Sequence, residues 1–153
     1  MDRRKLIGVG LAAVPVWWGL RQLATGAPSG RHTDAGPLEQ AFPLLGPLTD
    51  ATWVSSRDND DRGTPSPELA VSGFARLSSG KLDRLTESHG FVPADSPDEF
   101  SSWFEKPLKG RGPKNPQWIR SDELDSEADG RSLRLWFDRR TDTVRFRAVN
   151  PYG

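Results

Sequence analysis

The sequence predicts an α+β fold: a hydrophobic helix at the N-terminus, then a small antiparallel sheet of about four strands with helices on one face. Two observations carry this prediction. Near each end of the domain, apolar and polar residues alternate over two neighbouring segments, which is the period of half-buried strands. Between these pairs lie two segments that begin with helix-capping residues. The resulting order β-β-α-α-β-β is typical of strands and helices that segregate into separate layers.

Residues 1–26 have the features of a signal peptide or a membrane anchor. The basic residues 3–5 precede an uncharged apolar run over residues 6–20. This run is short for a membrane span, but its extension over residues 6–24 approaches the required length. Because basic residues stay on the cytoplasmic side, we expect residues 6–24 to lie in the cytoplasmic membrane and the C-terminal domain to lie outside.

Cleavage is the alternative to an anchor. Ala24 and Gly26 place small residues at the two positions that signal peptidase reads, so a cut near Gly26/Ala27 would release a secreted protein. The Arg3-Arg4 pair is also compatible with twin-arginine export, although we favour an ordinary basic n-region. The sequence leaves both cleavage and the export route open.

Residues 27–47 are rich in Gly, Pro, Ser and Ala, a composition that predicts a linker, with His32 solvated within it. Leu38 and Phe42 are apolar enough to begin docking onto the domain, so its boundary is soft. Residues 48–153 have the size of one domain and form the expected extracytoplasmic α+β unit.

The first half of this domain predicts two strands and a helix. Residues 51–56 are β-prone, and residues 69–77 alternate apolar and polar side chains, so the two segments can pair antiparallel across a polar loop. Ser78 or Ser79 can cap a following helix that runs to His89. We expect His89 to interact with the last turn of this helix.

The middle of the domain predicts a second, short helix. Residues 96–99 (Ser-Pro-Asp-Glu) form a capping box with Pro at the first helical position, and Pro107 ends the helix. Residues 118–119 are a short strand or a core plug. Residues 121–130 are acidic and expected to be exposed, with Leu124 as their anchor.

The C-terminal segment predicts a β-hairpin. One alternating set is apolar and is expected in the core: Leu133, Leu135, Phe137, Val144, Phe146 and Ala148. The other set shares the opposite face: Arg134, Trp136, Arg145 and Arg147. Guanidinium groups that stack on a tryptophan present donors to carboxylate or phosphate, so these four are the candidate anion or partner patch. The alternative is an ordinary solvated face, on which arginine stems shield Trp136.

Composition excludes several kinds of site. The chain has no Cys and only two His, which rules out disulfides, thiolate metal sites, a Cys nucleophile and a multi-His centre. It contains no nucleophile motif and no phosphate-binding loop, so we expect no catalytic, cofactor-binding or metal-binding residue. The net charge is zero, and the domain is mildly acidic once residues 1–26 are set aside, although residues 109–116 form a basic loop. We therefore expect no nucleic-acid binding.

From about Trp53 to Pro151 the layout is a strand, a loop with Asp and Pro, a strand running into a Ser-capped Leu-rich helix, and a closing hairpin. The hairpin reads Leu-Trp-Phe-Asp over residues 135–138 and Thr-Asp-Thr-Val-Arg-Phe over residues 141–146. This layout resembles small exported or membrane-anchored proteins of unknown function from high-GC Gram-positive bacteria. The resemblance implies the fold and the location, and it carries over no catalytic residue.

Two hypotheses for function follow. The first is a non-enzymatic, membrane-anchored or secreted domain that binds another envelope protein or an anionic envelope polymer. The second is a small hydrolase that acts on cell-wall material, which would need convergent carboxylates in a cleft.

Overall fold

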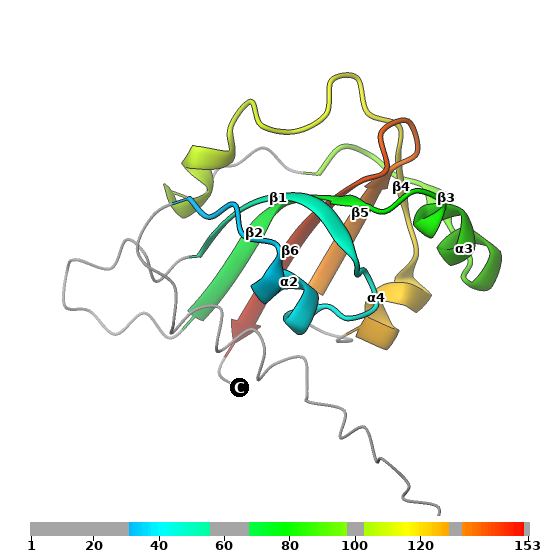
Figure 1. Ribbon diagram of the computed structural model, residues 1–153, viewed down its shortest axis with the longest axis horizontal. Helices are drawn as coiled ribbons and strands as arrows, with labels where there is room; N and C mark the ends of the chain where they lie inside the picture. Colours follow the sequence, from blue (N-terminus) through cyan, green and yellow to red (C-terminus); the bar gives the residue numbers. More distant parts are fainter. Residues whose placement is uncertain (1–30, 56–67, 98–102, 129–132, 152–153) are drawn as a thin grey trace, which may run out of the picture.

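The computed structural model describes residues 31–55, 68–97, 103–128 and 133–151. They form one antiparallel sheet of six strands, with helices packed on it (Figure 1). In the order of the sheet, the strands are β1 (Leu48–Ser55), β2 (Glu68–Leu77), β6 (Thr143–Pro151), β5 (Leu133–Asp138), β4 (Trp118–Arg120) and β3 (Val92–Pro93). The α+β class is confirmed, but the expected count of about four strands was too low.

The two additional strands extend the sheet beyond the C-terminal hairpin. β4 pairs with β5 through Trp118 and Ile119, and β3 pairs with β4 through two residues only. The predicted N-terminal hydrophobic helix lies outside the described residues. Within the described ranges, no helix is long and apolar enough to cross a membrane.

The four longer strands carry the core of the domain. In the C-terminal hairpin, Leu135 lies opposite Phe146 and Phe137 lies opposite Val144. The two apolar sets therefore share one face, as the alternation predicts. The apolar set on this face is almost completely buried: Leu133, Leu135, Phe137, Val144, Phe146 and Ala148 are 0–1% exposed. The two strands predicted in the first half also pair antiparallel, as β1 and β2.

Gly73 in β2 shows how tightly this core is packed. A Cβ atom at this position would lie 2.5 Å from the Thr52 carbonyl oxygen, 2.6 Å from Trp53 Cβ and 2.8 Å from Phe146 Cζ. Real Cβ atoms do not approach so closely, so the packing of Trp53 against Phe146 depends on a glycine between them.

Three helices cover this face of the sheet: α2 (Gly36–Ala41), α3 (Lys81–Ser88) and α4 (Asp122–Ala128). Each contributes buried leucine side chains to the same cluster, namely Leu38, Leu82, Leu85 and Leu124. The expected anchor Leu124 is therefore confirmed, but its acidic segment is a helix. Ser121 is the N-cap residue of this helix, because its Oγ accepts a hydrogen bond from the Leu124 backbone N–H at 3.2 Å.

The opposite face is covered as well, so the prediction of helices on one face only was wrong. A 3₁₀ helix, η2 (Trp103–Leu108), and the loop of residues 109–117 lie over it. Leu108, Trp118 and Phe74 are buried in a second apolar cluster on this side. Pro107 lies inside η2 and does not end it; the start of the expected helix, at residues 98–102, lies outside the described ranges.

The part of the expected linker that the structure describes, residues 31–47, packs on the domain. Phe42 and Leu45 are buried together with Leu38 of α2. His32 bridges to Trp53 by two backbone hydrogen bonds, and its ring lies 4.2 Å from the Trp53 ring between centroids. His32 is thus partly buried against β1 instead of solvated. The Gly- and Pro-rich composition predicted a linker, but the segment contains the short helix α2, which has Pro37 in its first turn.

The predicted start of α3 also needs correction. The residue that precedes its first turn is Gly80, in the left-handed conformation with φ of 76°, and no side chain caps the helix. Ser78 contributes its carbonyl oxygen, which accepts a hydrogen bond from the Lys81 N–H. The helix ends as expected at His89.

Candidate functional site

The structure brings the four residues of the predicted patch onto one face of the hairpin. Arg134 lies opposite Arg147, and Trp136 lies opposite Arg145. This face is not open to solvent along its length, because η2 and Trp118 lie over part of it. The four side chains therefore have different surroundings, and they do not act as one patch.

Arg145 is the most altered of the four, because it is 2% exposed. Its Nη1 donates hydrogen bonds to Ser72 Oγ and to the Phe146 carbonyl oxygen, both at 2.6 Å. Its Nη2 donates to Glu105 Oε1 at 3.0 Å, and Ser72 Oγ donates to the same oxygen at 2.6 Å. Glu105, which η2 supplies, is itself 3% exposed.

This buried network attaches η2 to the sheet. Burial lowers the pKa of the Arg145 guanidinium from its ordinary value, and the hydrogen bond and charge of Glu105 oppose this effect. Arg147 Nε lies 3.6 Å from the same carboxylate oxygen, so one glutamate faces two arginines. Because these donors are directed at Glu105, Arg145 is a structural residue and not a site for an external anion.

Trp136 is also held within the protein. The guanidinium carbon of Arg120 lies 5.1 Å from the centroid of the Trp136 ring, and Arg120 Nη2 donates to Asp125 Oδ2 at 2.8 Å. Burial raises the pKa of Asp125, whereas the hydrogen bond from Arg120 opposes the shift. Asp125 also accepts a hydrogen bond from the Leu135 N–H at 3.2 Å, which ties α4 to β5. Of the predicted patch, the exposed Arg134 and the partly exposed Arg147 are left for solvent.

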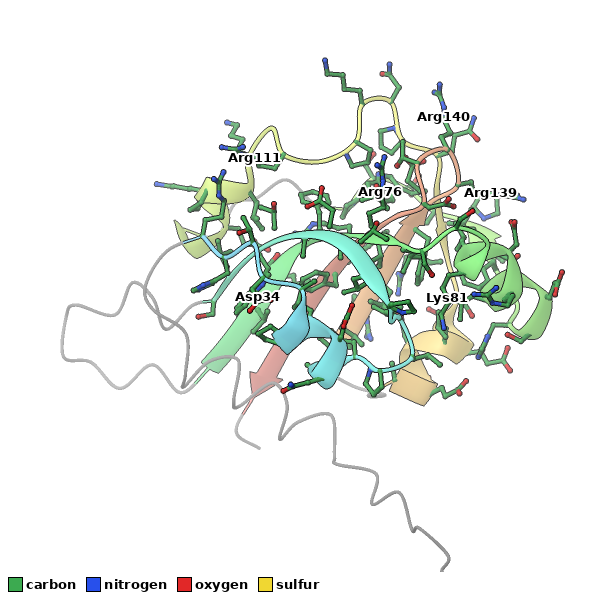
Figure 2. The ribbon with its side chains drawn as sticks, viewed as in Figure 1. Asp34, Arg76, Lys81, Arg111, Arg139 and Arg140 are labelled. Atoms are coloured by element: carbon green, nitrogen blue, oxygen red, sulfur yellow. The ribbon has the colours of Figure 1, made fainter. Side chains whose placement is uncertain are left out.

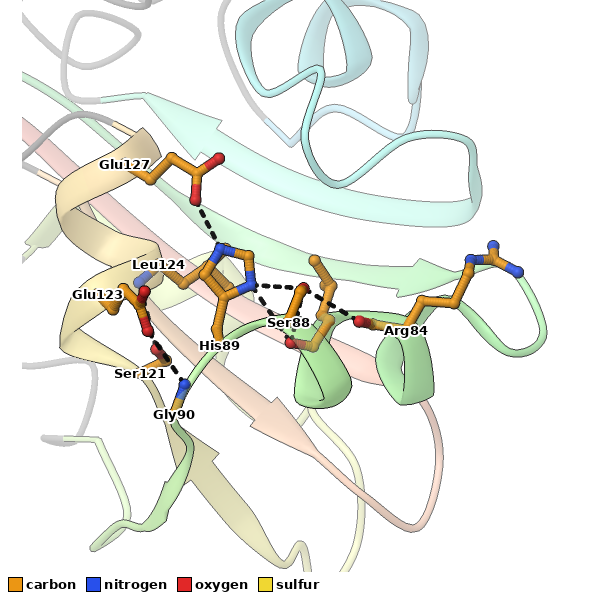
Figure 3. Close-up of polar contacts among 9 residues, drawn as sticks. Arg84, Ser88, His89, Gly90, Ser121, Glu123, Leu124 and Glu127 are labelled. Carbon is orange, nitrogen blue, oxygen red and sulfur yellow. Dashed lines mark hydrogen bonds and ion pairs between the residues drawn. The ribbon is translucent and has the colours of Figure 1, made fainter.

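A second polar cluster joins α3 to α4 (Figure 3). His89 Nε2 lies 2.5 Å from Glu127 Oε2, while His89 Nδ1 lies 2.9 Å from Ser88 Oγ and 3.3 Å from the Leu85 carbonyl oxygen. The neighbouring Gly90 N–H donates to Glu123 Oε2 at 3.2 Å. The expected interaction of His89 with the last turn of its helix is therefore confirmed.

The contacts of His89 and its burial act on its pKa in opposite directions. The hydrogen bond to Glu127 raises the pKa of His89, the contact with the Leu85 carbonyl also raises it, and burial opposes both. A protonated imidazole donates from both ring nitrogens, which matches carboxylate and carbonyl acceptors on its two sides. The single proton of Ser88 Oγ is directed at the Arg84 and Leu85 carbonyl oxygens, which only accept, so Ser88 Oγ accepts from His89. The cluster acts as a clasp between two helices.

A third feature is a row of cations that we call the basic edge. Arg76 lies at the end of β2, three cations lie in the loop of residues 109–117, and two lie in the turn between β5 and β6. The full set is Arg76, Lys109, Arg111, Lys114, Arg139 and Arg140, all exposed. In Figure 2, Arg111, Arg76, Arg140 and Arg139 follow one another from left to right across the upper part of the molecule. No ion pair joins any of the six to another residue of the described ranges.

The buried carboxylate of Asp138 holds the two loops of the basic edge together. It accepts hydrogen bonds from the Gln117 N–H at 2.8 Å, from the Arg140 N–H at 3.2 Å and from Thr141 Oγ1 at 2.6 Å. Across the same junction, Arg140 Nη1 donates to the Asn115 carbonyl oxygen at 3.2 Å. These hydrogen bonds hold the loop of residues 109–117 against the turn between β5 and β6, and these two segments carry five of the six cations.

A groove of about 250 Å³ lies within the basic edge. Its lining brings together Arg76 and Arg111 with the hydroxyl-bearing residues Thr52, Thr141 and Thr143. Asp50, which faces Arg76 across the β1–β2 pair, also lines it. The groove thus offers guanidinium donors and oxygen acceptors side by side, a combination that suits a ligand with both kinds of group.

Two basic segments of the sequence form this surface, but the alternation of residues gave no indication that they lie side by side. Residues 109–116 read as a basic loop, and Arg139-Arg140 stood in the hairpin turn, more than twenty positions later. Their proximity depends on Asp138, whose contacts are visible only in the folded chain. Among the described residues, no group of three or more His, Cys, Asp or Glu could hold a metal ion.

Comparisons with protein-family models, with curated proteins and with solved structures give no match for this chain.

Proposed function

We propose that the chain is a non-enzymatic binding module of the cell envelope. It is held outside the cytoplasmic membrane by residues 6–24, or it is secreted after cleavage near Gly26/Ala27. Its folded domain binds an anionic envelope polymer along the basic edge. The observation that carries this proposal is the row of six exposed cations, none of them in an ion pair with another described residue.

The arrangement of the cations favours a polymer over a single small anion. An exposed ion pair contributes only about 0.2–1 kcal/mol, so one cation cannot hold a ligand by itself. A chain with repeating negative charges would engage several cations at once, and their contributions would combine.

Among the described residues, the hydrolase hypothesis can be tested on the arrangement of Ser88 with His89 and Glu127. A general base at His89 would have to accept the Ser88 proton on Nδ1. That nitrogen faces the Leu85 carbonyl oxygen, which is an acceptor, so Nδ1 carries a hydrogen and has no lone pair to take the Ser88 proton. We therefore favour binding over hydrolysis.

The proposal is tested by retention of the full chain, in non-ionic detergent, on immobilised anionic envelope polymer. Replacement of Arg139 and Arg140 by Gln removes two cations from the basic edge and should weaken binding by about five- to tenfold. The matched control replaces Lys81 and Arg84 of α3 by Gln, which removes the same charge away from the row. The control should retain the affinity of the unchanged chain.

The salt dependence gives a second criterion. Binding through several ion pairs weakens with salt in proportion to the number of cations engaged, so the Arg139/Arg140 variant should show a shallower dependence. Equal retention of both variants would refute the basic edge as the binding surface. Absence of retention by the unchanged chain, with recovery of a single envelope protein in crosslinking, would replace the polymer by a protein partner.

A further inference from the structure

The groove between Arg76 and Arg111 has a feature that distinguishes one class of anion from another. Arg76 and Arg111 supply guanidinium donors on its lining, and Asp50 supplies a carboxylate. A carboxylate beside the cations is unfavourable for a bare anion, because like charges repel. It is favourable for a ligand that also carries hydroxyl groups, because those can donate hydrogen bonds to it.

The threonine hydroxyls of the groove are oriented by a chain of hydrogen bonds. Thr141 Oγ1 lies 2.6 Å from Asp138 Oδ2 and 2.9 Å from Thr143 Oγ1. A carboxylate only accepts, so Thr141 donates its single proton to Asp138. The proton between the two threonines must then come from Thr143. The hydroxyl of Thr143 therefore has its proton directed inward and its lone pairs left to accept from the groove.

We propose that this groove binds a hydroxylated anionic unit of the envelope polymer, such as a polyol phosphate or an acidic sugar. The anionic group takes donors from Arg76 and Arg111, and the neighbouring hydroxyls donate to Thr143 Oγ1 and Asp50. This inference rests on the proposed function and names the ligand class of the same surface.

The test compares small anions with and without hydroxyl groups, by NMR titration of the full chain in non-ionic detergent. Glycerol phosphate is compared with inorganic phosphate, and glucuronate is compared with acetate. At least one hydroxylated anion should bind about tenfold more tightly than its bare counterpart, the gain expected from one or two additional hydrogen bonds. The tighter of the two hydroxylated anions identifies the polymer as phosphate-based or sugar-acid-based.

Two variants locate the effect. Thr143→Val keeps the shape and the strand preference but removes one of the two acceptors, so the preference should fall severalfold while the affinity for the bare anion is unchanged. Thr86→Val in α3 is the matched control and should keep the preference. Equal affinity of the unchanged chain for hydroxylated and bare anions overturns the inference, as does a Thr143→Val variant that keeps the preference.

These outcomes are separable from those of the proposed function. Retention on polymer without discrimination between small anions leaves the basic edge as the binding surface and removes the groove. Discrimination without retention on polymer keeps the groove as a small-molecule site and removes the polymer.

Discussion

The buried carboxylate of Glu105 should be among the most consequential side chains for stability. It is 3% exposed and lies beside Arg145, which is 2% exposed. Glu105→Ala would leave that guanidinium buried without this counter-charge, and it would also remove the acceptor of the Ser72 hydroxyl. Breaking a buried pair in this way costs about 3–5 kcal/mol. A small domain has a total stability of about 5–15 kcal/mol, so this loss would be a large share of it.

The assay is urea unfolding of the full chain in detergent, followed by tryptophan fluorescence. The matched control is Glu87→Ala, an exposed glutamate of α3, which should stay within about 0.5 kcal/mol of the unchanged chain. The double variant Glu105→Leu with Arg145→Met should recover most of the loss, because a buried pair can be replaced by apolar groups of similar volume. A loss of less than about 1 kcal/mol for Glu105→Ala, or a double variant that recovers none of the loss, would refute the role given to this network.

Three further predictions concern the helix clasp, the core and the basic edge. The pKa of His89 is raised on folding, so its contribution to stability is complete below its unfolded pKa of about 6.5 and is lost as the pH rises through the raised value. Glu127→Gln should therefore lower the unfolding free energy by about 0.5–1 kcal/mol just below pH 6.5 and by little above the raised pKa. This range is small because Glu127 is exposed. A difference independent of pH would contradict the role of the His89–Glu127 contact. Gly73→Ala should lower the free energy of unfolding by about 3 kcal/mol in urea unfolding. The control Gly90→Ala, which has open space for a Cβ atom, should be nearly neutral. Similar effects at both positions would show that the close packing around residue 73 does not determine the cost. Asp138→Ala should cost about 2–4 kcal/mol, since three donors lose their acceptor, and it should weaken polymer retention; unchanged retention would show that the basic edge needs no brace.

The elements that could be predicted are those whose pattern is local. The alternation in β5 and β6 repeats over six or more residues, so it identified the buried face of the hairpin. β3 has two residues and β4 has three, which is too few to show a period. β4 is a strand because β5 provides its partner, and β3 is a strand because β4 does. α2 was missed because its glycine and proline suggested a linker, whereas burial of Leu38 and Phe42 in the core holds this segment on the domain.

The candidate site shows the same limit. Periodicity correctly placed Arg134, Trp136, Arg145 and Arg147 on one face. It could not indicate that Glu105, forty positions from Arg145 along the chain, covers that face from η2. It also could not join the basic loop to Arg140, because their contact passes through Asn115 and the buried Asp138.

The two ends of the sheet bear on how the domain behaves when many copies are crowded together. An open edge strand offers unpaired N–H and C=O groups to a neighbouring molecule and is a common starting point for aggregation. At one end, the Trp53 backbone N–H and carbonyl groups are already occupied by His32. At the other, β3 has two residues, and one of them, Pro93, has no N–H to donate. A further strand therefore finds the backbone groups of Trp53 already paired at one end of the sheet, and only the two residues of β3 at the other.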